Sequence, residues 1–465
     1  MARVNSRYKV LDNFNHTCYD WSSHTEIKIM LNFKDKKKSK KILIYGFGKT
    51  GESCFNFLNK YNEILVYDDN HKAIPKKIKK KYYLNINKIN FFFFDYIVIS
   101  PGININKCNL KLFLLKNKSK IITDLDLFYF NNFKNKKITI TGTNGKSTTA
   151  KLLFKILKDQ NKDVKLIGNI GIPVLTKSKV KPETIFVIEA SSYQIDYSQY
   201  FKTDYAFILN ISPDHLERHK SIKKYVRAKF KLLLNQNRNY YAFIENNKYL
   251  NSEIRKHKIK LKIIRVHENN LSIKKLIYNN YFNNINNFKN LLFILQFAKV
   301  FKLNKSKLFK TVNRFRGLNF RQQITYNNKF LTIINDSKST SFSSTVNLLK
   351  SYKNIYWILG GLAKKGDKFL LPSKYFQNIK GYIFGKNISF FKKILKDKIK
   401  FQSSNNLEMI LKKIANDIKF NKNNHSYVLF SPSAASFDKF KNFEDRGYYF
   451  NRLIKKTKFI KKIND

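Results

Sequence analysis

The sequence has few cysteines and no long apolar run. Cys18, Cys54 and Cys108 are the cysteines among its 465 residues, and their spacing matches no paired metal-binding motif. The cysteines therefore do not indicate a disulfide-based fold, and a reducing, cytoplasmic environment is expected. The most apolar segment, residues 91–99, is well short of the roughly 20 residues that a membrane span requires. The first residues also lack the apolar core of a signal peptide, so we expect no membrane association.

Acidic residues are scarce, with 31 Asp and Glu against 91 Lys and Arg, which gives a formal net charge of +60. Such a balance is typical of proteins that bind nucleic acids or anionic membranes. The basic residues, however, are mostly lysines spread along the whole chain, and no arginine-rich arm or nucleic-acid-binding module occurs. Asparagine, isoleucine, tyrosine and phenylalanine are also abundant, as an AT-rich coding sequence would produce. We therefore interpret the charge as compositional and expect no nucleic-acid partner.

The length of the chain suits two to four domains. Residues 1–40 have no clean periodicity and end in the basic run 36–41. We interpret this segment as an N-terminal extension and give it no function.

The most informative segment is the glycine-containing stretch Thr141–Thr149. The β-branched residues 137–140 before it predict a buried strand, and the apolar spacing after it predicts a helix. Strand, glycine turn and helix form the context of a phosphate-binding loop, in which Lys146 would reach the terminal phosphates and Ser147 would ligate Mg²⁺. The usual motif has a further glycine where this chain has Ile140. An ordinary glycine turn followed by a capped helix remains the alternative.

A second glycine motif, residues 46–51, follows the predicted strand 41–45 and precedes a helical pattern. Asp68 at the end of the next strand completes the fingerprint of a dinucleotide-binding fold. Ser100 follows a third predicted strand, 96–99, at the sheet edge where ligands usually bind. This arrangement would suit the NAD of a dehydrogenase or the diphosphate of a UDP-sugar equally well.

Polar residues also follow two strands after the phosphate loop. Glu189 ends the predicted strand 185–188 and is well placed to hold Mg²⁺, although a solvated strand-end glutamate is the alternative. The turn 210–219 follows the next strand and contains His215. A single histidine in a turn is often a surface residue, but the charged and imidazole groups gathered here favour a functional site.

The segment 222–233 predicts an amphipathic helix on which Tyr225 and Lys229 share a face. In so lysine-rich a chain, the residues alone indicate that Lys229 is solvent-exposed.

Three further predicted strands, 330–334, 355–359 and 427–430, also end in polar or glycine turns. The fold class is therefore α/β, with a Rossmann-like N-terminal domain, a central P-loop ATPase-like parallel sheet and a Rossmann-like C-terminal domain. The expected boundaries of these three domains are 41–125, 126–318 and 319–465.

This domain order, with the ATP loop in the middle, resembles the Mur ligases of peptidoglycan precursor synthesis. The third domain is most similar to the D-glutamate-adding branch of that family, in the segments Asn335–Thr340, Gly360-Gly361 with Lys364, Ser431–Asp438 and Arg446-Gly447. The resemblance covers about residues 42–465. The family often has histidine at the two positions where this chain has Asn286 and Phe320.

The resemblance implies functional residues in all three domains, with Lys146, His215 and Lys229 as the catalytic ones. The implied ATP-binding residues are Gly142, Thr143, Asn144, Gly145, Lys146, Ser147, Thr148, Asn287, Asn290, Arg321 and Asp336. The implied Mg²⁺ ligands are Ser147, Glu189, His215 and, as a carbamate, Lys229. The implied contacts to the UDP-substrate are Gly48, Thr50, Gly51, Asp68, Ser100 and Asn169. The implied D-glutamate contacts are Lys338, Thr340, Lys364, Ser436 and Phe443.

The implied reaction is the ATP-dependent ligation of D-glutamate to UDP-N-acetylmuramoyl-L-alanine by a monomer, with ATP and Mg²⁺ as cofactors. The alanyl carboxylate would attack the γ-phosphate of ATP, and the amine of D-glutamate would then attack the acyl phosphate. A folylpolyglutamate-synthase-like ligase is an alternative, but it would not need the UDP domain. A dehydrogenase would leave the phosphate loop unexplained, and a nonenzymatic nucleic-acid binder rests on charge alone.

Overall fold

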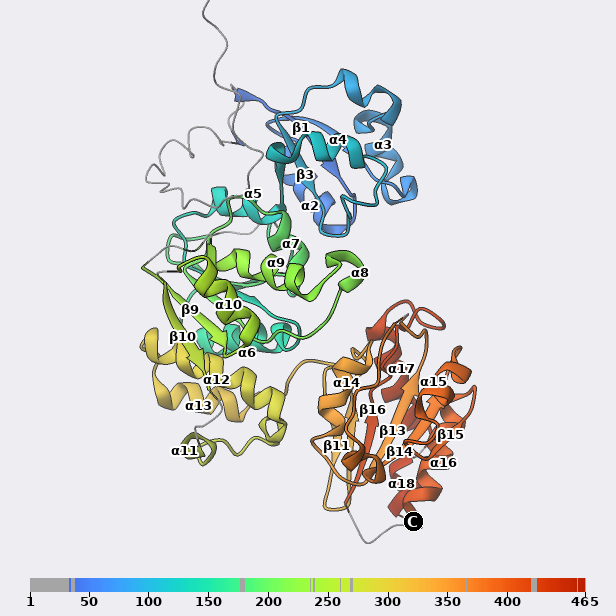
Figure 1. The fold of residues 1–465 in the computed structure, drawn as a ribbon. Coiled ribbons are helices and arrows are strands. Elements are labelled where there is room, and N and C mark those ends of the chain that lie inside the picture. Colours follow the sequence, from blue (N-terminus) through green and yellow to red (C-terminus); the bar gives the residue numbers. More distant parts are fainter. Residues whose placement is uncertain are drawn as a thin grey trace, which may run out of the picture. The chain divides into compact units, whose positions relative to one another are not determined.

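The structure is a computed structural model that describes residues 33–34, 38–175, 180–234, 236, 239–259, 261–267, 271–364, 366–419, 425–457 and 459–464 (Figure 1). As far as it is described, the chain forms two compact units. One comprises Met1–Thr143 with Lys165–Arg265, and the other comprises Asn144–Val164 with Val266–Asp465. The expected N-terminal extension, residues 1–40, lies outside the described residues except for 33–34 and 38–40.

The first sheet, blue in Figure 1, has parallel strands in the order β2-β1-β3-β4. Neighbouring residues of its strands enter different hydrophobic clusters, because Ile42 and Ile44 belong to one and Leu43 and Tyr45 to another. Both faces of the sheet are therefore covered, as in doubly wound folds. Its elements are β1 Lys41–Tyr45, α2 Lys49–Leu58, β2 Glu63–Tyr67, α3 Lys76–Tyr82, β3 Tyr96–Ile99, α4 Lys111–Lys116 and β4 Ile121–Ile122.

The second sheet has the strand order β10-β9-β8-β5-β7-β6. The pairs β5–β7, β5–β8 and β8–β9 are parallel, so the carboxyl ends of these strands meet at one edge. Its strands are β5 Lys137–Thr141, β6 Val164–Gly168, β7 Ile185–Glu189, β8 Tyr205–Ile208, β9 Tyr241–Glu245 and β10 Lys262–Val266. The helices between residues 124 and 313 are α5 Asp124–Asn131, α6 Lys146–Asp159, α7 Ser192–Tyr197, α8 Leu216–His219, α9 Ile222–Leu234, α10 Lys248–Lys256, α11 Leu271–Lys274, α12 Ile285–Val300 and α13 Lys305–Asn313.

The third sheet has the order β11-β12-β16-β13-β14-β15, in which β11 is antiparallel to β12 and the other pairs are parallel. Residues of α16, α17 and α18 share one hydrophobic cluster with the sheet, and residues of α14 and α15 share another, so helices cover both faces. The strands are β11 Gln323–Asn327, β12 Leu331–Asn335, β13 Ile355–Gly360, β14 Ile379–Phe384, β15 Phe401–Ser403 and β16 Ser426–Phe430. The helices are α14 Phe342–Leu349, α15 Ile388–Leu395, α16 Leu407–Lys419, α17 Phe443–Lys456 and α18 Phe459–Asn464.

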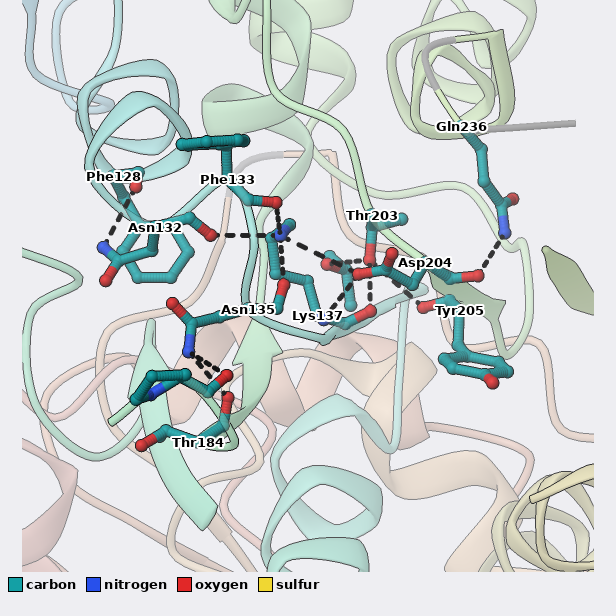
Figure 2. A network of polar contacts seen from close by, with 12 residues as sticks. Phe128, Asn132, Phe133, Asn135, Lys137, Thr184, Thr203, Asp204, Tyr205 and Gln236 are labelled. Atoms are coloured by element: carbon teal, nitrogen blue, oxygen red, sulfur yellow. Dashed lines mark hydrogen bonds and ion pairs between the residues drawn. The ribbon is translucent and has the colours of Figure 1, made fainter. Parts of the chain in front are cut away.

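A buried lysine anchors the start of β5 (Figure 2). Lys137 donates from Nζ to the carbonyl oxygens of Asn132 at 3.2 Å, Phe133 at 3.0 Å and Asn135, and lies 3.8 Å from Oδ2 of Asp204. Burial lowers the pKa of Lys137, while Asp204 raises it. Carbonyl oxygens of the connection between α5 and β5 thus surround the ammonium group of Lys137. These contacts fix the start of the strand that leads to the phosphate loop.

The predicted α/β fold is confirmed, and the structure adds strands that the sequence analysis did not predict. The segment 235–285, for which the sequence analysis gives no prediction, contains β9, α10, β10 and α11. The helix α12 begins at Ile285, where the side chain of Asn284 caps it by accepting from the backbone N–H of Asn286 and Asn287. Within the described ranges, we find no helix that is long and apolar enough to cross a membrane.

Candidate active site

The predicted phosphate-binding loop joins β5 to the 14-residue helix α6. Gly145 caps this helix with a φ of 83°, a left-handed conformation that glycine adopts without strain. A Cβ at Gly145 would lie 2.3 Å from Oδ1 of Asn290, a residue of α12. Ser147 and Thr148 are buried in the first turn of α6. The helix N-terminus therefore offers N–H groups to an anion, with Asn290 against the loop.

Lys229 is buried, with 1% of its surface exposed. Its ammonium nitrogen donates to the carbonyl oxygen of Gly142 at 2.9 Å and to Oγ1 of Thr141 at 3.3 Å. It also lies 4.7 Å from the centroid of the Tyr225 ring, whose hydroxyl is 3.1 Å from Oγ1 of Thr143. The face that these two residues share therefore packs against the end of β5, and the interpretation of Lys229 as solvent-exposed is wrong.

Glu189 ends β7 next to the phosphate-loop strand and is also 1% exposed. Its Oε1 accepts from Nδ2 of Asn169 at 3.0 Å, and its carbonyl oxygen accepts from the Asn169 backbone N–H at 2.9 Å. Its Oε2 is buried and has no hydrogen-bond partner among the described residues. A buried carboxylate oxygen without a donor is unfavourable, so this position suits a cation. The solvated strand-end interpretation of Glu189 is therefore wrong.

The turn after β8 contains two histidines in different surroundings. His215 has a φ of 53°, an uncommon left-handed conformation, and its ring nitrogens lie 3.3 Å from Asp214 and 3.6 Å from Glu217. His219 is buried, and its Nε2 lies 3.0 Å from Oγ of Ser192. Burial, with nearby Arg218 and other cations, lowers the pKa of His219 to about 4. His219 is therefore neutral at pH 7, whereas His215 is partly exposed beside carboxylates.

The glycine turn of the first sheet is held by two predicted UDP-site residues. Ser100 donates from Oγ to the Gly46 carbonyl oxygen at 2.7 Å, and Asp68 accepts from the Phe47 backbone N–H at 2.7 Å. A Cβ at Gly51 would lie 1.9 Å from the Gly46 oxygen, so this close approach requires glycine. Gly48 is the exposed N-cap of α2, with open space where a Cβ would be. The N-terminus of α2 is thus accessible to a diphosphate.

Asp336 follows β12 and is buried among hydrogen-bond donors. Oγ of Ser431 donates to its Oδ2 at 3.0 Å, and the backbone N–H of Gln322 donates to its Oδ1 at 3.1 Å. Burial raises the pKa of Asp336 to about 7, although these donors and the charges of Arg321 and Arg446 lower it. This carboxyl group therefore titrates near neutral pH.

Predicted D-glutamate residues meet around the same sheet edge. Nζ of Lys338 lies 4.1 Å from the centroid of the Phe443 ring. The bridge between Leu362 and Ala435 joins the two chain segments that carry Lys364 and Ser436. Cations and hydroxyls from three loops are thus brought to one edge, a combination that suits a dianionic ligand.

Comparisons with known proteins identify the family. The description Mur ligase middle domain matches residues 140–309, and the description Mur ligase MurD-like, N-terminal domain, matches residues 40–122. UDP-N-acetylmuramoylalanine–D-glutamate ligase of Rickettsia bellii is 34% identical over 444 residues, covering 90% of this chain and 97% of the relative. The protein of the same name from Francisella philomiragia is 31% identical over 436 residues, covering 91% and 99%. The chain belongs to the Mur ligase family.

Two solved Mur ligase structures have the same fold as this ligase. MurF from Acinetobacter baumannii aligns with a TM-score of 0.55 at 15% identity, covering 71% of this chain and 79% of that one. MurF from Thermotoga maritima in complex with ADP aligns with a TM-score of 0.51 at 13% identity, covering 91% and 97%. The three-domain α/β organisation predicted from the sequence is therefore confirmed, while the domain boundaries remain predictions.

The structure of this Mur ligase brings some of the predicted site residues into contact with one another. Asn169 contacts Glu189, and Lys338 contacts Phe443. Thr340 and Lys364 are exposed. Asn287 donates from Nδ2 to the carbonyl oxygen of Tyr281 at 3.0 Å. Within the described part of the chain, no group of His, Cys, Asp and Glu residues could hold a metal ion by itself. The functional roles of these residues remain predictions.

Sequence reasoning missed Arg218 of α8. Its guanidinium donates to the carbonyl oxygens of the turn after β3 and lies over Tyr193, the first aromatic residue of α7. A signal was available, because Arg218 follows His215 by three residues and Tyr193 and Tyr197 are spaced by four, so each pair falls on one helical face.

Proposed function

We infer that this chain is an ATP-dependent ligase that adds D-glutamate to UDP-N-acetylmuramoyl-L-alanine in peptidoglycan precursor synthesis. The observation that carries this function is the similarity to D-glutamate ligases over 90% of the chain. That similarity includes the third domain, whose motifs distinguish the acceptor amino acid. The ADP complex of a structurally similar MurF supports the use of ATP.

We propose that Lys146 neutralises the charge that builds up on the γ-phosphate as the alanyl carboxylate attacks it. Lys146 is the first residue of α6, and the N–H groups of this first turn would face the same phosphate. Phosphorylation activates the carboxylate, which is by itself a poor acylating group. The amine of D-glutamate then attacks the acyl carbon, and phosphate leaves.

The residues present fit a Mg²⁺ site. Glu189 has a buried oxygen without a donor, and Lys229 is a buried amine beside the phosphate loop. Carbamylation of Lys229 would replace a buried cation by an anion, which gives the metal a second carboxylate-like ligand. Glu189, His215, Ser147 and carbamylated Lys229 are the proposed ligands. When bound, Mg²⁺ would neutralise phosphate charge in the transition state.

We propose that Lys338 and Lys364 bind the two carboxylates of D-glutamate, with hydroxyls of Thr340 and Ser436 and the ring of Phe443 completing the site. Arg446 supports this edge from beneath, because its buried guanidinium donates to the carbonyl oxygens of Ser337 at 2.7 Å and Ala434 at 2.9 Å. These bonds fix the backbone beside Lys338 and Ser436.

Phosphate release from ATP tests the proposal. With UDP-N-acetylmuramoyl-L-alanine present, release should depend on D-glutamate and not on L-glutamate. Lys146→Ala should lower the rate by about 100- to 1,000-fold, because one charged donor to the transition state is lost. Lys158→Ala changes an exposed lysine of the same helix and should retain the rate. A D-glutamate-independent rate, or normal turnover by Lys146→Ala, would contradict the proposal.

A further inference from the structure

Arg218 joins the turn after β3 of the first sheet to the helices beside the second sheet. Its Nη1 donates to the carbonyl oxygens of Pro101 at 2.7 Å and Gly102 at 3.3 Å, and its Nη2 donates to that of Ile103 at 2.7 Å. One guanidinium therefore holds consecutive carbonyls of a single turn. The planar fork of arginine can reach these acceptors together, which a lysine ammonium cannot do in the same way.

Aromatic residues of α7 hold the guanidinium in place. Its central carbon lies 4.1 Å from the ring centroid of Tyr193 and 5.2 Å from that of Tyr197. Such cation–π contacts attract the guanidinium to the faces of the two rings. The hydroxyl of Tyr197 also accepts from the backbone N–H of Ile105 at 3.3 Å. The segment 101–105 is thus fixed from two helices, α7 and α8.

The held segment continues into the proposed UDP site. Ser100 precedes it directly, and its hydroxyl donates to Gly46 in the glycine turn. On the other side, Arg218 lies three residues after His215, in the same short turn and helix. A continuous set of contacts therefore runs from the glycine turn through Ser100 and Arg218 to the segment that carries His215.

We propose that Arg218 is a positioning residue that sets the distance between the UDP end of the substrate and its reacting carboxylate. This inference rests on the proposed function, in which one substrate spans the first sheet and the carboxyl edge of the second. A nucleoside diphosphate bound at α2 fixes one end only. The hydrogen bonds from Arg218 to the carbonyl oxygens of residues 101–103, which we call the Arg218 clamp, determine where the other end lies relative to His215. Even a small misplacement of a reacting group lowers the reaction rate strongly.

Steady-state kinetics and fragment binding test the role of Arg218. In Arg218→Gln, kcat/KM for UDP-N-acetylmuramoyl-L-alanine should fall by about 10- to 100-fold, because the substrate is held in the wrong register. The Kd of UDP alone and the KM of ATP should stay within about twofold of the wild type. Neither ligand spans the segment that Arg218 positions, so neither binding site depends on the distance across it. Arg218→Lys keeps the positive charge but lacks the planar guanidinium that donates to consecutive carbonyl oxygens, so its kcat/KM should also fall.

Arg227→Gln is the matched control, since Arg227 is a half-exposed arginine of α9 that pairs with Glu253 at 3.9 Å. It should behave as the wild type. The inference is overturned if Arg218→Lys retains normal kcat/KM, or if UDP affinity falls as much as substrate affinity, which would make Arg218 a direct ligand or a purely structural residue. A wild-type chain without D-glutamate-dependent phosphate release would refute the proposed function itself.

Discussion

The raised pKa of Asp336 makes the stability of the third domain depend on pH. Its carboxyl group is buried after β12, and burial raises its pKa from 3.8 to about 7. The folded protein therefore holds a proton between pH 4 and pH 7 that the unfolded chain has already released. Stability is highest below pH 4 with respect to this group, and it falls as the pH rises to 7.

The size of the effect follows from the same change in pKa. A rise from 3.8 to about 7 corresponds to about 4 kcal/mol, at about 1.4 kcal/mol for each pH unit. Asp336→Asn removes this titration and keeps an oxygen that can accept from the Gln322 backbone N–H. It loses the charge-assisted bond from Ser431, worth about 1–2 kcal/mol. At pH 8 the variant should therefore be more stable by about 2–3 kcal/mol, and at pH 4 it should be no more stable than the wild type.

Trp357 provides the assay. It is fully buried in β13, and its Nε1 donates to the carbonyl oxygen of Ser431 at 2.8 Å, so its fluorescence reports on this domain. Trp21, the other tryptophan of the chain, should be replaced by Phe so that the signal comes from Trp357. Urea unfolding without nucleotide should then be followed from pH 4 to pH 8. Glu444→Gln, an exposed carboxylate of α17, is the control and should keep the wild-type pH profile. Equal pH profiles for Asp336→Asn and the wild type would refute the reasoning.

Two further predictions concern the buried lysines. Lys229→Met should abolish the incorporation of ¹³CO₂ as a carbamate, measured by ¹³C NMR, and most of the turnover should be lost with it. Lys224→Met, on the exposed side of α9, should change neither. A carbamate signal that persists in Lys229→Met would contradict the proposed modification. Lys137→Met leaves Asp204 buried without its cation and should destabilise the protein by about 3–5 kcal/mol, measured as a lower thermal unfolding temperature. Lys137→Met combined with Asp204→Asn should recover part of that loss, and an unchanged unfolding temperature of the single variant would show that the network in Figure 2 contributes little.

Local chemistry explains which parts of the fold could be predicted from the sequence. The strands β1, β5, β7 and β12 are short, largely apolar runs rich in β-branched residues that lead into glycine or polar turns, a pattern typical of buried parallel strands. The edge strands β10 and β15 are half-buried and mix lysine, glutamine and serine with their apolar residues. Their pairing partners, and not their own sequence, determine that they are strands, so they were not predicted.

In the candidate site, too, some residues could be predicted from local sequence and others could not. Glycine and hydroxyl motifs carry their own signal, because positive φ and anion binding need particular residue types at fixed spacing. Asp68 was predicted as a ligand contact, yet in the structure it accepts from the Phe47 backbone N–H and so also shapes the glycine turn. Arg218 has no motif, since its acceptors are backbone carbonyls that any residue could provide. Only the three-dimensional contact reveals such a residue.

Composition hides the lysines that matter most in this chain. With 91 Lys and Arg residues, a lysine at any position is expected to be a solvated one. Lys137 and Lys229 are both buried, but their ammonium groups contact different parts of the fold. Lys137 is surrounded by carbonyl oxygens and lies near Asp204, which stabilise its charge. Lys229 donates to the carbonyl oxygen of Gly142 in the phosphate loop and to Oγ1 of Thr141. A carbamate on Lys229 would place an anion beside the phosphate loop, where the proposed metal ion needs a ligand, so Lys229 is the buried lysine whose modification serves the proposed function.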